Sequence, residues 1–165
     1  MKRISPLMLL LATMMLLTAC SFSKASNNTV SFYYPRTEPE YHEKDSVITI
    51  EEREIAGNTE DLNYILSLYM IGPLDDTLTS PLPKGSRLYS VIQENGSIRI
   101  ILSDLDKTLN DVHFSLAAAC LSLTCMDCAG AEEVTVQSGE RTVQLSREDI
   151  LLVDTTSEIF NSLED

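Results

Sequence analysis

The cysteine residues are the first side chains whose type and spacing could support chemistry. Three of them, Cys120, Cys125 and Cys128, follow the pattern Cys-x4-Cys-x2-Cys, and Cys-x2-Cys is half of a zinc site or a redox pair. No second Cys-x2-Cys is present, and neither His42 nor His113 has ligand spacing to the cluster. We therefore favour small apolar fillers at the buried end of a helix over a Cys125–Cys128 disulfide or a metal site.

An acidic run follows an apolar strand. Asp104, Asp106 and Thr108 come after the apolar residues 100–102 in the pattern D-x-D-x-T, which resembles the opening motif of haloacid-dehalogenase-type phosphatases. The resemblance implies that Asp104 would attack phosphorus and Asp106 would act as acid and base. That chemistry also needs a downstream Lys for the phosphate charge and further acids for Mg²⁺. Because no Lys follows Lys107, the phosphatase stays a remote alternative to solvated acids at a strand end.

The same oxygen-bearing side chains, from Asp104 to Asn110, alternate as calcium ligands do in an EF-hand loop. That loop requires Gly at its sixth position and Glu at its twelfth, and Leu109 and Ser115 occupy them here. We therefore reject a calcium loop. No Ser/His/Asp set, phosphate-binding loop or pair of catalytic carboxylates stands out, so we expect no catalytic residue, no metal and no cofactor.

The N-terminus carries the features of an export signal. Lys2 and Arg3 precede an apolar run from Leu7 to Leu17, which is shorter than the roughly 20 residues that span a bilayer. Leu17-Thr18-Ala19-Cys20 then resembles the bacterial lipobox, in which the Cys is acylated and the signal is cut before it. We favour this lipid attachment at Cys20 over an ordinary cleaved signal with a chance Cys or an uncleaved anchor, since two acyl chains hold a protein on a membrane.

A short polar segment separates Cys20 from the rest of the chain. Residues 21–29 (SFSKASNNT) are small and polar and show no periodicity, which indicates a flexible tether. Such a tether has a root-mean-square reach of roughly 15–18 Å. We expect the protein on the extracytoplasmic face of the cell membrane, with a signal peptide at 1–19, an acylated tether at 20–29, a folded domain at 30–153 and a short helix or tail at 154–165.

Charge excludes two classes of partner. The 165 residues include 12 Lys or Arg and 25 Asp or Glu, for a formal net charge of −13. Binding to nucleic acid needs a basic face that neutralises phosphates, and docking on anionic lipids needs one as well. We therefore expect no nucleic acid partner and membrane association through lipid alone.

Hydrophobic periodicity predicts two helices. The first starts after the polar residues 58–61, buries Leu62, Ile65, Leu66 and Tyr69 on one face, and ends at Gly72-Pro73. The second runs from about Val112 to Met126 and ends at Gly130. A third, short helix or frayed end is predicted at 155–163.

Turn residues and β-branched runs predict six strands. They are 30–34, 47–55, 87–93, 97–102, 133–137 and 141–145. Asn95-Gly96 and Ser138-Gly139 each predict a hairpin, because these residues tolerate positive φ. The order β-β-α-β-β-α-β-β predicts an α+β fold: a two-layer sandwich with a mostly antiparallel or mixed sheet and two helices on one face.

A longer pattern runs through the chain. It comprises the helix ending in Gly72-Pro73, the loop LTSPLPKGS at 78–86, two strands around Asn95-Gly96, an Ala-rich helix, and Gly130-Ala131-Glu132-Glu133-Val134. This pattern resembles the GerMN domain, the family of sporulation and spore germination proteins. The likeness runs from about Val30 to Leu145. Pro81 and Pro83 fix φ in the loop, Gly85 frees the turn into the next strand, and Leu78 and Leu82 could pin the loop across the sheet.

The resemblance implies no catalytic residues. It implies a non-enzymatic, lipid-anchored envelope module with an assembly or scaffolding role, linked in some members to endospore formation or germination. The expected contacts are made by the loop residues Leu78, Ser80, Leu82, Pro83 and Gly85, and the expected partner is an envelope protein with a basic patch. The alternative is a protein that binds peptidoglycan or another wall ligand. Such a site would use aromatic platforms, and a chain with six Tyr and no Trp supports this alternative less well.

Overall fold

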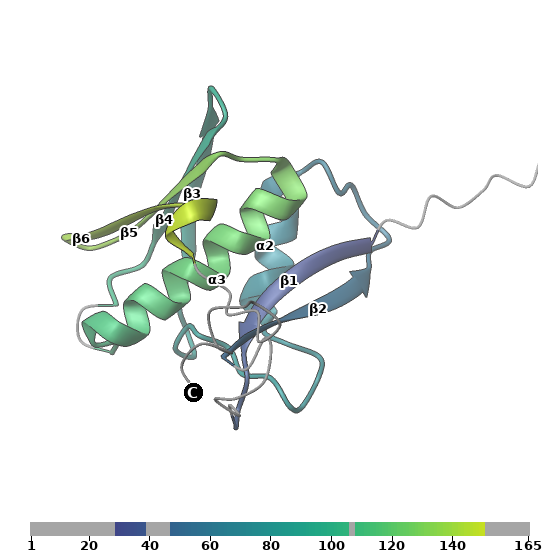
Figure 1. The fold of residues 1–165 in the computed structure, drawn as a ribbon, viewed down its shortest axis with the longest axis horizontal. Coiled ribbons are helices and arrows are strands. Elements are labelled where there is room, and N and C mark those ends of the chain that lie inside the picture. Colours follow the sequence, from purple (N-terminus) through teal and green to yellow (C-terminus); the bar gives the residue numbers. More distant parts are fainter. Residues whose placement is uncertain (1–28, 39–46, 106–107, 151–165) are drawn as a thin grey trace, which may run out of the picture.

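The computed structural model describes residues 29–38, 47–105 and 108–150 of the chain (Figure 1). Its strands are β1 (Thr29–Pro35), β2 (Ile48–Glu54), β3 (Leu88–Glu94), β4 (Ser97–Leu102), β5 (Glu133–Ser138) and β6 (Arg141–Ser146). Its helices are α2 (Leu62–Ile71), α3 (Asp111–Ala129) and the 3-10 turn η1 (Arg147–Asp149). The predicted signal sequence, Cys20, the predicted tether up to residue 28, Asp106 and the helix predicted at 155–163 lie outside the described residues.

The described strands form two sheets. β1 and β2 make an antiparallel pair, and β3-β4-β5-β6 form a four-stranded sheet in that order. In the larger sheet β4 and β5 run parallel, whereas β3 with β4 and β5 with β6 run antiparallel. The parallel pair needs a crossover connection, and α3 supplies it.

The two hairpins of the larger sheet turn where the sequence predicts. Between β3 and β4, Asn95 has φ 51° and Gly96 has φ 81°, which is the pair of positive values that a type I′ turn requires. Between β5 and β6, Gly139 has φ 59°. These turns match the right-handed twist of the strands and so hold each pair in register.

Helix α3 is the centre of the fold. Its N-cap Asn110 accepts a hydrogen bond from the backbone of His113, and its C-cap Gly130 is left-handed, with φ 64°. Every residue from Cys120 to Met126 is buried, because the helix lies between β1 on one side and β5 and β6 on the other (Figure 1). The length and composition of α3 would also suit a membrane span, and its burial inside the fold accounts for that composition.

Helix α2 packs one face into the same core. Asp61 caps its N-terminus by accepting hydrogen bonds from the backbone of Asn63 and Tyr64, and the helix ends at Gly72, whose φ is 99°. The buried residues are the ones that the spacing predicts: Leu62, Ile65, Leu66 and Tyr69. Ser80 Cβ lies 3.9 Å from the position that a Cβ on Gly72 would take, which is an ordinary contact, so the positive φ rather than lack of space favours glycine here.

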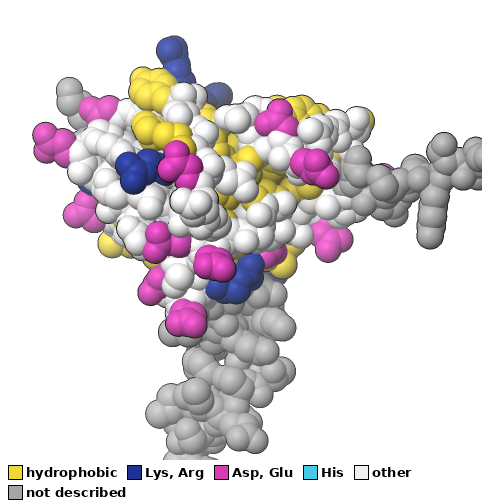
Figure 2. Space-filling model, turned by 90° about the horizontal axis from the view of Figure 1, so that it is seen from above, with side chains coloured by type: hydrophobic (Ala, Val, Ile, Leu, Met, Phe, Trp, Pro, Cys, Tyr) yellow, Lys and Arg dark blue, Asp and Glu magenta, His cyan; other side chains and the backbone are white. Residues whose placement is uncertain are grey.

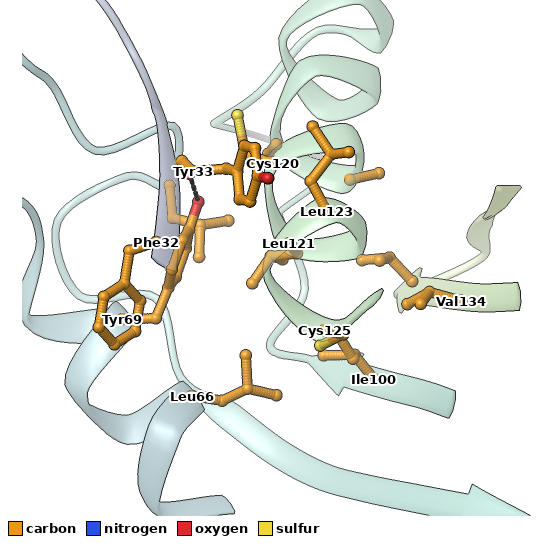
Figure 3. Close-up of a cluster of buried hydrophobic side chains, with 14 of the residues drawn as sticks. Phe32, Tyr33, Leu66, Tyr69, Ile100, Cys120, Leu121, Leu123, Cys125 and Val134 are labelled. Carbon is orange, nitrogen blue, oxygen red and sulfur yellow. Dashed lines mark hydrogen bonds between the residues drawn. The ribbon is translucent and has the colours of Figure 1, made fainter. Parts of the chain in front are cut away.

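The apolar core joins the two sheets through the helices. Figure 3 shows side chains of β1, α2, α3, β4 and β5 meeting in one cluster, with Phe32, Tyr69, Leu121, Ile100 and Val134 among them. Each of these five side chains is at most 1% exposed. The two sheets therefore share one core.

The structure confirms the predicted α+β class, with both helices packed against a mixed sheet. It also confirms both predicted helices, although α3 starts one residue before the predicted start and ends at Ala129. The predicted strands are present with boundary shifts of about one residue. The expected pairing of the first two strands is present. These strands form a sheet of their own, however, whereas the sequence predicts one sheet.

Candidate functional site

The acidic run that suggested phosphate or calcium chemistry contributes mainly local structure. Thr108 Oγ1 donates a hydrogen bond to the carbonyl of Leu105, and Asn110 is the N-cap of α3. Asp104 follows β4, and Asp106 lies outside the described residues. Among the residues that the structure describes, no group of three or more His, Cys, Asp or Glu is placed to hold a metal ion.

The three cysteines that the structure describes, Cys120, Cys125 and Cys128, lie on α3 and are free thiols. Cys120 and Cys125 are fully buried, as the core-filling interpretation expects, and Cys128 is half-buried. Burial raises the pKa of Cys120 to about 12 and that of Cys128 to about 11, and it holds the pKa of Cys125 well above its ordinary value. The thiolate, which is the reactive form, is therefore suppressed at neutral pH.

The predicted interaction loop is anchored at two leucines. Leu78 and Leu82 are each 7% exposed, and Leu78 forms an isolated antiparallel bridge with Arg36. Thr79 N donates to Pro35 O at 2.9 Å, so the loop runs along the end of β1. Both leucines therefore anchor the loop to the core.

The other predicted loop residues are more accessible. Ser80 and Pro83 are half-buried, Gly85 is exposed, and Gly85 has φ 92°, as a free turn into β3 requires. Ser80 Oγ donates to Leu82 O at 3.1 Å and thus closes the turn. What these side chains bind stays a prediction, whereas their role in shaping the loop is visible.

The corner at Gly72-Pro73, where this loop begins, is held by two charged residues of β2. Glu51 Oε1 accepts hydrogen bonds from Leu74 N at 2.7 Å and Asp75 N at 2.8 Å. Arg53 donates to Gly72 O at 2.8 Å and forms an ion pair with Glu51. Both side chains are only 10% exposed, so the pair acts as an internal clamp on the corner.

Arg53 is also held by aromatic rings of β1. Its guanidinium carbon lies 4.6 Å from the centroid of the Phe32 ring and 5.5 Å from that of Tyr34. A guanidinium over a ring face is attracted by the negative charge density of that face. The clamp is thereby fixed from the core side as well as from the loop side.

A groove of about 480 Å³ runs beside this clamp. One wall is the segment from Glu51 to Ala56, which is β2 and the residues after it. The other wall is a stripe of α2, made by Tyr64, Leu68 and Ile71, and Leu74 adds to the lining. Ile71 and Leu74 are each 76% exposed, so the groove has an open apolar rim.

Acidic groups surround the groove. Glu52 and Glu54 are exposed on β2, and Asp75 and Asp76 are exposed after the corner. Hydrogen bonds from Thr77 lower the pKa of Asp75, so that carboxyl stays ionised. Figure 2 shows one face of the molecule, where Asp and Glu side chains are more prominent than Lys and Arg, as the negative net charge requires.

Sequence reasoning missed the groove and the clamp. The spacing of Tyr64, Leu68 and Ile71 at i, i+4 and i+7 was an available signal, since it places a second apolar stripe beside the buried one. Glu51 and Arg53 alternate along a predicted strand, and the strand is all that their pattern predicts. The neighbouring residues do not indicate that these two side chains contact residues 72–75.

Comparison with known proteins adds one structural likeness. No family model matches the chain, and no curated protein matches it. A crystal structure of a Clostridium perfringens protein provisionally described as a lipoprotein is similar, with 18% sequence identity, a TM-score of 0.45, and coverage of 74% of this chain and 89% of that one. A likeness at this level assigns neither a family nor a function to this chain.

Proposed function

We propose that this protein is a lipid-anchored, non-enzymatic binding module on the extracytoplasmic face of the cell membrane, where it contacts another envelope protein. The observation that carries the proposal is Leu17-Thr18-Ala19-Cys20 followed by a polar segment that ends where β1 begins, at Thr29. Acylation of Cys20 would hold the start of the folded domain at a root-mean-square distance of roughly 14–17 Å from the anchor, given the reach of the eight residues 21–28.

Binding rather than catalysis suits the described side chains. Several side chains that could take part in chemistry are instead used to hold the fold. The thiols are buried, Asn110 caps α3, and Glu51 and Arg53 clamp a loop. The accessible features are an apolar groove and its acidic rim. An acidic surface steers encounter with a basic partner more than it sets the final affinity.

The same proposal includes a GerMN-like role in assembly, of the kind that some members of that family have in endospore formation or germination. It is supported by the GP corner and the loop at 78–86, which the sequence shares with that family's pattern. The competing wall-ligand function would use exposed aromatic platforms. Tyr33, Tyr34 and Tyr69 are each at most 4% exposed and are unsuited to stack on a glycan, whereas Tyr89 on β3 is 65% exposed and offers a single such side chain.

Metabolic labelling tests the anchor directly. Cells that express the full chain are fed an alkyne-tagged fatty acid, and the purified protein is probed for the tag. We expect label on the wild type and on the matched control Cys128→Ala, and none on Cys20→Ala, which should also lose membrane association. Label retained by Cys20→Ala, or an unlabelled wild type released into the medium, would overturn the proposal.

A further inference from the structure

In the β1–β2 hairpin, the phase of the hydrogen bonds, meaning which residue pairs exchange them, shows which backbone groups point outward from each edge. Arg36 N donates to Val47 O at 3.0 Å. In an antiparallel pair every second residue pair exchanges hydrogen bonds, and the pairs between them point their N–H and C=O groups outward. Counting along the register from Arg36 and Val47, the outward-pointing residues of β2 include Ile50, Glu52 and Glu54.

On β1 the outward groups of Tyr33 and the carbonyl of Pro35 are satisfied inside the protein. Tyr33 N donates to Thr124 Oγ1 at 3.1 Å, and Tyr33 O accepts from the Tyr69 hydroxyl at 3.0 Å. Pro35 O accepts from Thr79 N at 2.9 Å. These contacts agree with the phase and show that α3, α2 and the loop close the β1 edge from Tyr33 to Pro35.

The outward groups of β2 face the groove side of the hairpin instead. Within the ranges that the structure describes, no residue bonds the backbone N–H or C=O of Ile50, Glu52 or Glu54. The groove follows this edge, because its lining includes each residue from Glu51 to Ala56 in succession. Its opposite wall is the apolar stripe of Tyr64, Leu68 and Ile71 on α2. An open row of backbone groups beside an apolar stripe is the arrangement that accepts an added strand.

We propose that an extended, basic segment of a partner protein adds as a third strand to the β2 edge. Its backbone would pair with Ile50, Glu52 and Glu54. Its side chains on one face would cover the α2 stripe, and Lys or Arg on the other face would lie beside Glu52 and Glu54. This inference rests on the proposed function, since it names the surface and the chemistry of the partner.

Charge selects this occupant over a second copy of the chain. Pairing two β2 edges would bring Glu52 and Glu54 of both copies together, and like charges opposite one another destabilise a sheet. The formal charge of −13 adds a general repulsion between copies. A basic segment meets the same carboxylates with the opposite sign.

Proline at position 52 is a selective test of strand addition. The Glu52 N–H points away from β1, so Glu52→Pro removes a donor that only an added strand would use and leaves the β1–β2 hydrogen bonds in place. Glu52→Ala is the matched control, because it removes the same carboxylate and keeps the N–H. Circular dichroism and the urea midpoint of each variant establish that both remain folded.

The probe is an acetylated, amidated peptide of alternating Lys and Val, with a length equal to the 7 residues of β2. Its binding to the full chain in detergent is followed by fluorescence anisotropy, and backbone hydrogen exchange locates the site. We expect binding that protects residues 48–56, weakens at least about tenfold in Glu52→Pro, and weakens less than about fivefold in Glu52→Ala. An alternating Glu and Val peptide should not bind.

Four outcomes would overturn the inference. Three are no binding of the Lys and Val peptide, equal binding by wild type and Glu52→Pro, and protection confined to the four-stranded sheet. The fourth is concentration-dependent dimerisation through residues 48–56, which would assign the edge to a second copy instead. None of these results depends on Cys20, so a failure here and a failure of the lipid anchor are distinguished by separate measurements.

Discussion

Tyr34 and Tyr69 stack face to face in the core, with ring centroids 4.6 Å apart and an angle of 14° between the planes. The Tyr34 hydroxyl donates to Tyr69 O at 3.1 Å, and the Tyr69 hydroxyl donates to Tyr33 O at 3.0 Å. The two residues come from β1 and α2, so each element satisfies backbone carbonyls of the other. This reciprocal contact fixes α2 against the hairpin and thereby sets the width of the groove between α2 and β2.

Removing one of these hydroxyls should destabilise the fold. Tyr69→Phe keeps the stacked ring but leaves Tyr33 O buried without its donor, which typically costs about 1–3 kcal/mol. Urea denaturation should show that loss. Tyr89→Phe is the control, since Tyr89 is 65% exposed. A free energy of unfolding for Tyr69→Phe equal to that of the control would contradict the reciprocal arrangement.

Two neighbouring hydroxyls on α3 should respond in opposite ways. Thr124 Oγ1 accepts from Tyr33 N and donates to Cys120 O, so Thr124→Val orphans a strand N–H and should cost about 1–3 kcal/mol. Ser122 Oγ is buried and has no hydrogen-bond partner in the part of the chain that the structure describes. Ser122→Ala should therefore be neutral or stabilising. Equal destabilisation by both substitutions would count against a specific role for Thr124 at the β1 edge.

Hydrogen exchange of the backbone amides near the Gly72-Pro73 corner tests the clamp formed by Glu51 and Arg53. Glu51→Gln weakens the acceptor for Leu74 N and Asp75 N and removes the negative partner of Arg53. We expect these two amides to exchange faster, and we expect a loss of roughly 3 kcal/mol in stability, because the pair is nearly buried. Glu52→Gln provides an exposed neighbouring control. Unchanged protection at Leu74 and Asp75 in Glu51→Gln would rule out the clamp.

Stability should fall in alkali through the buried thiol of Cys120. Burial raises its pKa from 9.0 to about 12 in the folded protein. Below pH about 9 both states keep the proton; at higher pH the unfolded state loses it first, so the contribution disappears as pH rises towards 12. Cys120→Ala should flatten the curve of unfolding free energy against pH by up to about 1.4 kcal/mol per unit in this window. Ser122→Ala should keep the wild-type slope, and identical slopes for all three proteins would refute the assignment.

Local patterns predicted the elements because each rests on residues close in sequence. The spacing of Leu62, Ile65, Leu66 and Tyr69 decides the buried face of α2, and Asn95-Gly96 decides a hairpin whatever surrounds it. The parallel pairing of β4 with β5 was not predictable in this way. The parallel pairing depends on α3 crossing over the sheet and packing against β1. These contacts join residues that are far apart in the sequence, so no local pattern indicates them.

The candidate site was only partly predictable, for the same reason. Prolines and a glycine identified the loop at 78–86, and the burial of Leu78 and Leu82 follows from their being its apolar residues. The contacts of Glu51 with Leu74 and Asp75 join residues more than 20 positions apart. Likewise, the β2 edge is open because β2 pairs only with β1 among the described strands. The local sequence of β2 does not indicate this pairing.

Site-specific photo-crosslinking in cells tests the central claim, that this anchored domain binds a protein through the β2 edge. A photoreactive amino acid replaces either Ile50, on β2 and 46% exposed, or Thr142, an exposed residue of β6. After irradiation, mass spectrometry identifies the crosslinked segment. We predict adducts from position 50 to a segment with basic residues alternating with apolar ones, present with Cys20 intact and lost in Cys20→Ala. Adducts with wall glycan, or the same adducts from position 142, would contradict the claim.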